Sequence, residues 1–340
     1  MKNVVNIYLR SKGGLFHGWG HVIRSLTVAR YLKKSDKSIK IFMAVEGGTV
    51  IKEFMDKQDI KCFVFDEHSS IFREREEIRD FSPNIIIVDM LDVPEYLLTL
   101  YEESSDKLVI FNDLGRNYNN GDILICPQIL SAYPQRKNNQ KQLNGTDYFV
   151  ISEGIEKNRY RPEGIPVNAK SLLIIMGGCI QQVVFKKLIE VVEKLRNLNL
   201  EIYFSLGFDN DVDMNCYRQL ESHGVYFIKG TDNIGEFMTK ADVAISSSGY
   251  VKYELAATGT PSILVSVVEH QDELAKAFVE KSNCAEYLGN IIELEVAAIA
   301  NSVINLIKDK ERRRDMAKGG QGLIDGNALE RIKQEILVEA

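Results

Sequence analysis

The segment HGWGHVIRS, residues 17–25, places a titratable side chain directly after a glycine-bracketed turn. An imidazole titrates near neutral pH, so His21 at this position can accept a proton from water as a general base. Gly18 and Gly20 lack side chains and let a substrate approach the backbone closely. Arg24, one helical turn further on, would neutralise an anion or hold the loop. The alternative interpretation is structural: His21 caps a helix and Arg24 lies on the surface.

A second glycine turn, MGGCIQQ, follows an apolar run in the second half of the chain. A helix that begins there would present unpaired backbone N–H groups and partial positive charge, which suit a phosphate. We therefore take Gly178, Cys179 and Ile180 as candidate diphosphate-binding residues. A purely structural glycine turn explains the same pattern equally well.

The segment SSSGYVKYELAATGTP, residues 246–261, has the same character. The small residues Ser247, Ser248 and Gly249 would expose a helix amino terminus to a diphosphate. Glu254, one to two turns into that helix, could accept hydrogen bonds from the two hydroxyls of a ribose. The alternative for Glu254 is a solvated acid between small packing residues.

Three polar residues begin another helix in the segment VVEHQDELAKAF. Glu269, His270 and Gln271 could contact a sugar or water at that place. Capping of the helix by the same side chains is the alternative interpretation.

The elements that must position these loops are buried strands followed by helices. Short apolar runs rich in Val, Ile and Phe alternate with stretches of helical period, and such continuous runs are typical of parallel strands covered on both faces. The first half contains VVNIYL, IKIFMAV, KCFVFD, NIIIVDM, KLVIFNDL and DILICP, and the second half contains SLLIIMGG, EIYFSLG, GVYFIKG, DVAISSSG and PSILVSV. In open parallel sheets ligands lie beyond the carboxyl ends of the strands, where all four loops would lie.

The alternation lapses between about residues 129 and 170, where polar and turn-forming residues predict a flexible loop and then a domain connection. A chain of 340 residues is also long for one core. We therefore predict a Rossmann-like domain over 1–160, a second over 161–325, and a helix over 326–340 that crosses back to the first domain. Two such domains would face a central cleft.

Composition excludes several classes of protein. No stretch reaches the 18 or so unbroken apolar residues of a membrane span, and the amino terminus lacks the features of a secretory leader, so we expect a cytoplasmic protein. The net charge is only -6 without a basic stripe, which argues against nucleic acid as a partner. Five scattered cysteines fit neither a disulfide framework nor a zinc site. Neither a GxGxxG nor a GxxxxGK[ST] motif supports a dinucleotide or P-loop site.

Taken together, these segments resemble the nucleotide-sugar hydrolases of pseudaminic acid biosynthesis, which act on UDP-2,4-diacetamido-2,4,6-trideoxy-β-L-altropyranose, and the related spore-coat polysaccharide proteins. The resemblance is carried by GWGHVIRSLTVARYL, NDLGRNYNNGDILICPQ, MGGC and NIGEFMTKADVAISSSGYVKYELAATGTPSILV, and it runs over most of the chain. More distantly, the second half is similar to the glycosyltransferase of peptidoglycan lipid synthesis. The fold that the resemblance implies is GT-B, an α/β architecture of two Rossmann-like domains.

The resemblance implies attack of water on the anomeric carbon of a UDP-linked amino or deoxy sugar, with inversion and without a metal or cofactor. His21 matches the expected general base, and Gly18, Gly20, Arg24 and Asp89 fall on the sugar side with Glu269, His270 and Gln271. His17 and Trp19 stand outside the resemblance, and we expect these bulky groups to shape the sugar site.

Two other functions remain open from the sequence. A glycosyltransferase for surface polysaccharide would use the same fold and the same histidine with a hydroxyl group as acceptor. A non-catalytic nucleotide-sugar binding protein would bind the donor without turnover. The oligomeric state is not predicted by the sequence.

Overall fold

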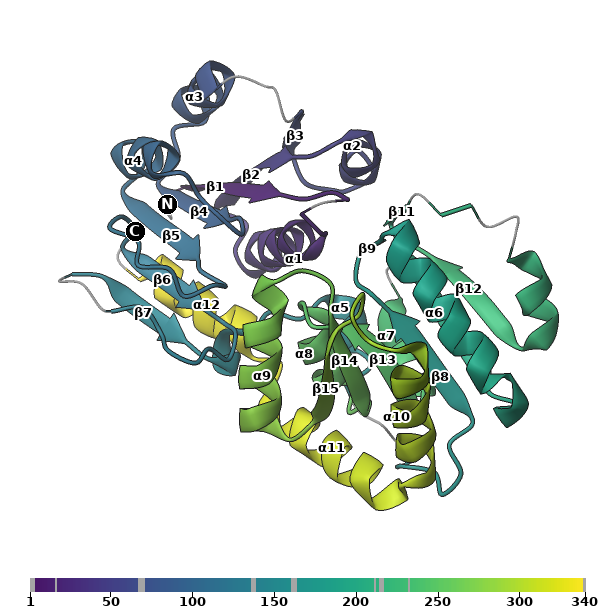
Figure 1. The fold of residues 1–340 in the computed structure, drawn as a ribbon. Coiled ribbons are helices and arrows are strands. Elements are labelled where there is room, and N and C mark those ends of the chain that lie inside the picture. Colours follow the sequence, from purple (N-terminus) through teal and green to yellow (C-terminus); the bar gives the residue numbers. More distant parts are fainter. Residues whose placement is uncertain are drawn as a thin grey trace. The chain divides into compact units, whose positions relative to one another are not determined.

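The computed structural model describes residues 4–15, 17–66, 71–135, 139–159, 164–210, 212–213, 217–231 and 233–338. The chain divides into two compact units (Figure 1). The first comprises Met1–Val150 together with Gly326–Ala340, and the second comprises Ile151–Asp325. The chain therefore first passes between units after Val150, not near residue 160 as the loss of alternation suggested.

The first unit is built on a seven-stranded parallel sheet with the strand order β3-β2-β1-β4-β5-β6-β7. Every residue of β4 is buried, as expected for an apolar run covered on both faces. The strands are β1 (Val5–Lys12), β2 (Ile39–Glu46), β3 (Cys62–Phe65), β4 (Ile85–Asp89), β5 (Lys107–Phe111), β6 (Ile123–Cys126) and β7 (Lys141–Asn144).

Helices cover this sheet and bury the apolar stripes that the sequence predicts. In α1 the buried residues include Val22, Leu26, Ala29 and Leu32, at spacings of three and four. The helical elements of the unit are α1 (Gly20–Ser35), α2 (Thr49–Met55), α3 (Ile71–Phe81), α4 (Glu95–Glu103), η1 (Thr146–Tyr148) and α12 (Ala328–Leu337).

A buried ion-pair network joins α3 to the sheet of the first unit. Arg10 of β1 donates to Glu74 of α3 at 3.0 Å and to Glu46 of β2 at 2.6 Å. Tyr101 of α4 donates its hydroxyl to the same Glu74 at 2.7 Å. Burial raises the pKa of Tyr101, and the neighbouring Glu74 raises it further. The network is well hydrogen-bonded, which is what makes buried charge tolerable.

The second unit is built on a six-stranded parallel sheet with the order β12-β10-β8-β13-β14-β15. The strands are β8 (Ser171–Ile175), β10 (Glu201–Gly207), β12 (Val225–Lys229), β13 (Val243–Ser247), β14 (Ser262–Ser266) and β15 (Ala285–Asn290). A separate two-stranded pair consists of β9 (Cys179–Ile180) and β11 (Asp209–Asn210).

The helices of the second unit alternate with these strands. They are α5 (Glu153–Glu156), α6 (Gln182–Leu195), η2 (Arg196–Leu198), η4 (Arg218–His223), α7 (Ile234–Lys240), α8 (Val251–Ala257), α9 (His270–Ser282), α10 (Val296–Lys308) and α11 (Lys310–Leu323). Within the described residues, no helix has both the length and the apolar character needed to cross a bilayer.

The polar stretch over 129–170 is more ordered than predicted. It contains the edge strand β7, the short helix η1 and the helix α5, whereas the sequence predicted a flexible loop followed by the domain connection. The carboxy-terminal helix α12 packs on the first unit, where Glu330 accepts a hydrogen bond from Tyr31 of α1 at 2.5 Å.

The strand orders place a topological switch point in each unit. In the first unit, the chain runs outward from β1 through β2 and β3 on one side, and through β4 and β5 on the other. In the second unit, β8 and β13 are the corresponding central pair. Ligands of open parallel sheets bind at the carboxyl ends of such pairs. The loops after β1, β4, β8 and β13 are therefore the first places to look for a site.

Candidate functional site

The loop after β1 brings His21 to the carboxyl edge of the first sheet. Gly18 has φ +73°, a conformation that favours glycine, and its carbonyl accepts a hydrogen bond from the Gly14 N–H at 2.9 Å. This tight turn leads into α1, whose first residue is Gly20. Trp19 occupies the N-cap position of α1 and its side chain makes no capping hydrogen bond, so His21 is not the helix cap of the structural interpretation.

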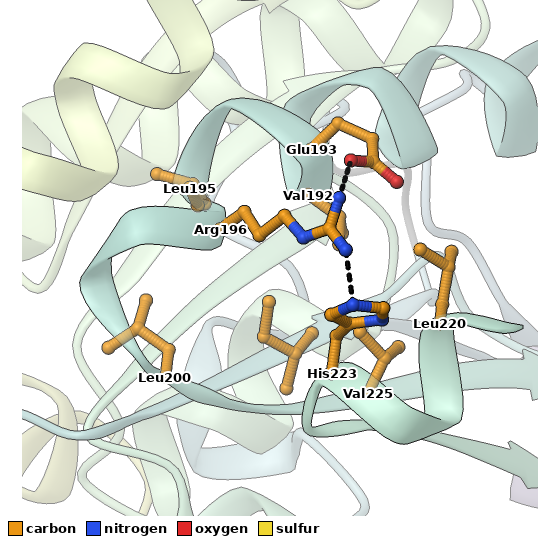
Figure 2. Close-up of a pocket in the computed structure, with 9 residues that line it drawn as sticks. Val192, Glu193, Leu195, Arg196, Leu200, Leu220, His223 and Val225 are labelled. Carbon is orange, nitrogen blue, oxygen red and sulfur yellow. Dashed lines mark hydrogen bonds and ion pairs between the residues drawn. The ribbon is translucent and has the colours of Figure 1, made fainter.

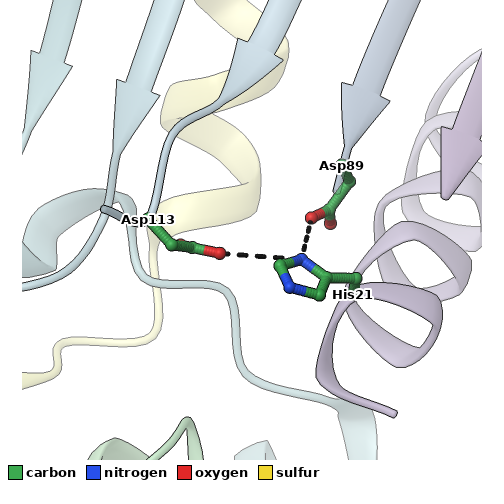
Figure 3. A group of neighbouring side chains, drawn as sticks. All are labelled: His21, Asp89 and Asp113. Carbon is green, nitrogen blue, oxygen red and sulfur yellow. Dashed lines mark hydrogen bonds and ion pairs between the residues drawn. The ribbon is translucent and has the colours of Figure 1, made fainter. Parts of the chain in front are cut away.

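His21 points inward to the carboxylate at the end of β4. Its Nδ1 lies 2.7 Å from Oδ1 of Asp89, and the two side chains are 6% and 0% exposed. Figure 3 shows both pointing toward each other, with Asp113 approaching the same ring nitrogen from a different direction. A neutral imidazole that donates Nδ1–H to a carboxylate has its lone pair on Nε2. This arrangement orients the ring and assigns Nε2 the role of proton acceptor.

Arg24 connects this pair to a second carboxylate. Its Nε donates to Oδ2 of Asp89 at 2.7 Å, and NH1 donates to Oδ1 of Asp113 at 2.9 Å. Its NH2 donates to Oδ2 of Asp113 at 2.9 Å and also to Oδ1 of Asp89. The guanidinium lies 4.2 Å from the ring centre of Phe111. A bidentate, stacked arginine of this kind is held rigidly.

His21, Asp89 and Asp113 also have the spacing of a metal site, since one ligand atom from each lies within 4.8 Å of the others. The chemistry of the cluster does not fit a cation well. Arg24 already donates to oxygens of both carboxylates and supplies positive charge there. The arrangement therefore suits a hydrogen-bonded base better than a metal centre.

Arg24 and Asp89, which the sequence predicts to bind sugar, lie inside this cluster of buried charged side chains. Arg24 and Asp89 are 3% and 0% exposed and bond to each other, and contact of either residue with the sugar stays a prediction. Asp113 was not among the predicted site residues. The sequence contained a signal for Asp113, because this residue directly follows the strand run KLVIFN. Neighbouring parallel strands such as β4 and β5 end at the same edge of the sheet.

The two loop residues that lie outside the resemblance, His17 and Trp19, separate into surface and core. Trp19 is 2% exposed and packs edge-on against Phe54 of α2, with ring centres 5.2 Å apart. Its ring therefore belongs to the core of the first unit, and an influence of Trp19 on the sugar site stays a prediction. His17 is exposed.

In the second unit, the turn after β8 does not lead straight into a helix. Gly177 has φ +100°, and Cys179 and Ile180 then form β9 before α6 begins at Gln182. The prediction of a helix amino terminus at 178–181 was wrong for this reason. Burial raises the pKa of the Cys179 thiol to about 11, so the thiol is protonated and a poor nucleophile at neutral pH.

The turn after β13 is tied to both neighbouring strands. Ser247 donates its hydroxyl to the Met176 carbonyl, after β8, at 3.0 Å. Ser248 donates both its N–H and its hydroxyl to the Val265 carbonyl of β14, each at 2.9 Å. Both donors of Ser248 are therefore used internally, and its place in the diphosphate site stays a prediction. Lys252 of α8 holds the same turn by donating to the Ser248 and Gly249 carbonyls at 2.8 and 3.2 Å.

Glu254 lies on α8 and is partly buried. Desolvation by burial raises the pKa of its carboxyl to about 7. Across the part of the chain that the structure describes, no hydrogen bond or ion pair to this carboxyl group is recorded. A desolvated carboxyl group of this kind, beside a turn at a switch point, is typical of a functional site.

The three residues predicted to contact the sugar at the start of α9 differ in their surroundings. Gln271 accepts the Val267 N–H at 3.0 Å through Oε1, which directs its amide nitrogen toward Gly249; a Cβ added at Gly249 would lie 3.6 Å from it. The fixed amide is an oriented donor beside the turn after β13. Glu269 and His270 are exposed at the beginning of the helix.

A further hollow lies at the opposite edge of the second sheet. It is lined by residues from the end of α6 and the beginnings of β10 and β12, and Figure 2 shows Arg196 between Glu193 and His223. These are the amino-terminal ends of the strands, where parallel sheets do not bind their ligands. We assign the site to the carboxyl ends instead.

Comparisons with known proteins agree with this fold. Residues 172–334 match the glycosyltransferase family 28 C-terminal domain. The chain is 24% identical to the spore coat polysaccharide biosynthesis protein SpsG of Bacillus subtilis strain 168, over 96% of each chain. This similarity confirms the predicted likeness to spore-coat polysaccharide proteins.

Two solved structures are similar over nearly their full length. MurG of Acinetobacter baumannii has a TM-score of 0.67 and 12% identity, covering 98% of this chain and 99% of that chain. The UDP-GlcNAc 2-epimerase of Neisseria meningitidis bound to UDP-GlcNAc has a TM-score of 0.65 and 14% identity, covering 98% of this chain and 100% of that chain. The predicted fold class, GT-B with two Rossmann-like domains, is confirmed.

Proposed function

We propose that the protein hydrolyses a UDP-linked sugar, with His21 as the general base. The observation that carries the proposal is the buried contact between His21 Nδ1 and Asp89 at 2.7 Å, at the switch point of the first sheet. It leaves the lone pair on Nε2 in the neutral ring, as a base for water requires. The likeness to SpsG and to a UDP-GlcNAc epimerase supports a nucleotide-sugar as the substrate class.

In the proposed reaction, a water oxygen attacks the anomeric carbon and the bond from that carbon to the diphosphate oxygen breaks. The bonding electron pair leaves with UDP, and Nε2 of His21 accepts the water proton. The free sugar is released with inverted anomeric configuration. No metal or cofactor takes part, and we place the reaction in surface polysaccharide or nonulosonic acid biosynthesis.

The nucleotide is proposed to bind at the switch point of the second sheet. Glu254 would accept hydrogen bonds from the ribose hydroxyls. The backbone around Gly178 and Gly249 would receive the diphosphate, and the amide of Gln271 is an oriented donor beside it. Cys179, Ile180 and Ser247 would shape the diphosphate site. Gly18 and Gly20 would border the sugar, and Glu269 and His270 would contact it.

Glycosyl transfer is the second candidate function, and the match to a glycosyltransferase family domain favours it. The same base would then take a proton from a hydroxyl group of an acceptor. Nucleotide release from a panel of UDP-sugars, measured with and without candidate acceptors, separates the two. Hydrolysis predicts full release without any acceptor, and transfer predicts release only when an acceptor is present. Donor binding without release under either condition would indicate a binding protein.

His21→Asn tests the proposed base. The asparagine amide can keep the contact with Asp89 but has no group in the place of Nε2, so turnover is expected to fall by about 10²- to 10⁴-fold while UDP binding stays unchanged. His223→Asn is the matched control, because His223 lies at the amino-terminal sheet edge of the second unit. Release of UDP by His21→Asn at the wild-type rate would overturn the assignment.

A further inference from the structure

Two carboxylates lie on the Nδ1 side of His21. Asp89 is 2.7 Å from Nδ1 and Asp113 is 3.6 Å from it, and both carboxylates are buried. Buried carboxylates at these distances favour the protonated imidazolium. An imidazolium has no lone pair and cannot act as a base. The two acids together therefore work against the role proposed for His21.

Arg24 places a compensating positive charge on the same side of the ring. Its NH2 lies 3.4 Å from His21 Nδ1 while the guanidinium donates to both carboxylates. A guanidinium remains charged throughout the working pH range. Two carboxylates and one guanidinium leave a single net negative charge beside the ring. Without Arg24 there would be two net negative charges beside the ring.

We propose that Arg24 is a positioning residue that keeps His21 neutral and in its Nδ1–H tautomer near neutral pH. It does so by offsetting the charge of Asp113, while Asp89 accepts the Nδ1 proton. The role of the neutral ring as a base rests on the proposed function. The charge balance itself is a property of the first unit and can be measured without substrate.

Among the described residues, the charged groups in contact with His21 come from three places in the first unit. Arg24 lies on α1, Asp89 ends β4, and Asp113 follows β5. On the neighbouring loops, Arg116 and Asp92 form an exposed pair at 3.0 Å. The charges of that pair cancel and solvent screens them, so the three buried groups determine the balance.

Nitrogen-15 NMR of the histidine rings in the full chain tests the proposal directly. The chain has five histidines, and the His21 signals are assigned by their loss in His21→Asn. At pH 7.5 the wild-type ring is expected as the neutral Nδ1–H tautomer with an unprotonated Nε2. An Nε2–H tautomer, or an imidazolium at that pH, would contradict the proposal.

Substitutions of opposite charge sign are expected to move the His21 titration midpoint in opposite directions. Arg24→Met should raise the midpoint by about one pH unit or more, and Asp113→Asn should lower it by a similar amount. The double variant Arg24→Met/Asp113→Asn restores a single net negative charge and should return the midpoint toward wild type. A purely structural role predicts no such rescue.

If Arg24→Met does not fold, Asp113→Asn and Arg24→Lys still decide the matter. The lysine keeps the charge, so its midpoint should stay near wild type, whereas Asp113→Asn should lie below it. Equal midpoints in wild type and Asp113→Asn would overturn the proposal. The proposed function fails separately, if His21→Asn hydrolyses UDP-sugars at the wild-type rate.

Discussion

Glu254 combines burial with a carboxyl group, and its pH behaviour follows from that combination. Burial raises the pKa of the folded carboxyl from 4.5 to about 7. The folded state therefore binds this proton more tightly than the unfolded state does. The stability that this group contributes is fully present below about pH 4.5 and is lost as pH rises through about 7.

Glu254→Gln is expected to remove this pH dependence. At pH 8 the glutamine avoids burying a charge, so the free energy of unfolding should rise by about 1 to 3 kcal/mol, while at pH 4 it should hardly change. Urea unfolding at the two pH values measures the difference. Glu236→Gln is the control, since the Glu236 side chain is 44% exposed and pairs with Lys240 and Asn233. The hydrogen bond from Lys240 lowers the pKa of the Glu236 carboxyl, so this substitution should bring no gain in stability at pH 8. An equal change at both pH values would contradict the burial argument.

At the residue scale, the sequence reveals His21 as a candidate base but not the side chains that contact it. The glycine turn and the start of a helix are local signals, and both are visible in HGWGHVIRS. Asp89 and Asp113 lie 68 and 92 positions further along the chain and reach the ring only through the pairing of β1, β4 and β5. The burial of Trp19 against Phe54 likewise depends on tertiary packing.

At the element scale, the loop after β8 is shaped by close backbone contact with the end of β10. Gly207 has φ +73°, and a Cβ there would lie 2.5 Å from the carbonyl carbon and oxygen of Gly178. The Gly178 carbonyl also accepts the Phe208 N–H at 2.8 Å. Gly207 therefore fixes the position of the loop proposed to receive the diphosphate.

Gly207→Ala is expected to lose more than about 1 kcal/mol of stability and to weaken UDP binding, because neither the positive φ nor the space accepts a methyl group. Gly322→Ala is the matched control. It lies inside α11 with no atom within 4 Å of the added Cβ, so it should stabilise the protein by about 0.5 to 1 kcal/mol. Calorimetric UDP titration and urea unfolding measure both effects. Wild-type UDP affinity in Gly207→Ala would argue against this loop as the diphosphate site.

Strands with strong apolar runs were predictable, and short polar strands were not. The runs over β4, β8 and β13 are continuous and buried, which makes them visible in the sequence. The edge strand β7 has the sequence KQLN with only Leu143 buried, and β9 has just two residues. Such strands carry almost no periodic signal. This is why the region around 141 was predicted as loop and the one at 179 as a helix start.

At the scale of the whole molecule, the last helix of the chain, α12, stabilises the unit that also contains the first helix, α1. Ile332 and Ile336 of α12 are buried in the first unit, and Lys107 of β5 donates to the Ile336 carbonyl at 2.9 Å. The residues that match the family domain, 172–334, include part of α12, although α12 packs with the first unit. Contacts, not chain order, define the units.

Ile336→Ala is therefore expected to destabilise the first unit by about 2 to 5 kcal/mol and to leave the second unit unchanged. Hydrogen exchange read by mass spectrometry resolves the two units, and fluorescence of the single tryptophan, Trp19, reports on the first. Val338→Ala is the control, because Val338 is 61% exposed. Faster exchange confined to the second unit would contradict the placement of α12.

The most direct test of the central claim is hydrolysis in water labelled with oxygen-18. A UDP-sugar turned over by the wild-type protein without an acceptor should yield unlabelled UDP. The free sugar, analysed before its anomeric oxygen exchanges with solvent, should carry the heavy isotope. Attack of water at the anomeric carbon predicts this distribution. Label in the phosphate of UDP, or UDP release that requires an added acceptor, would contradict it.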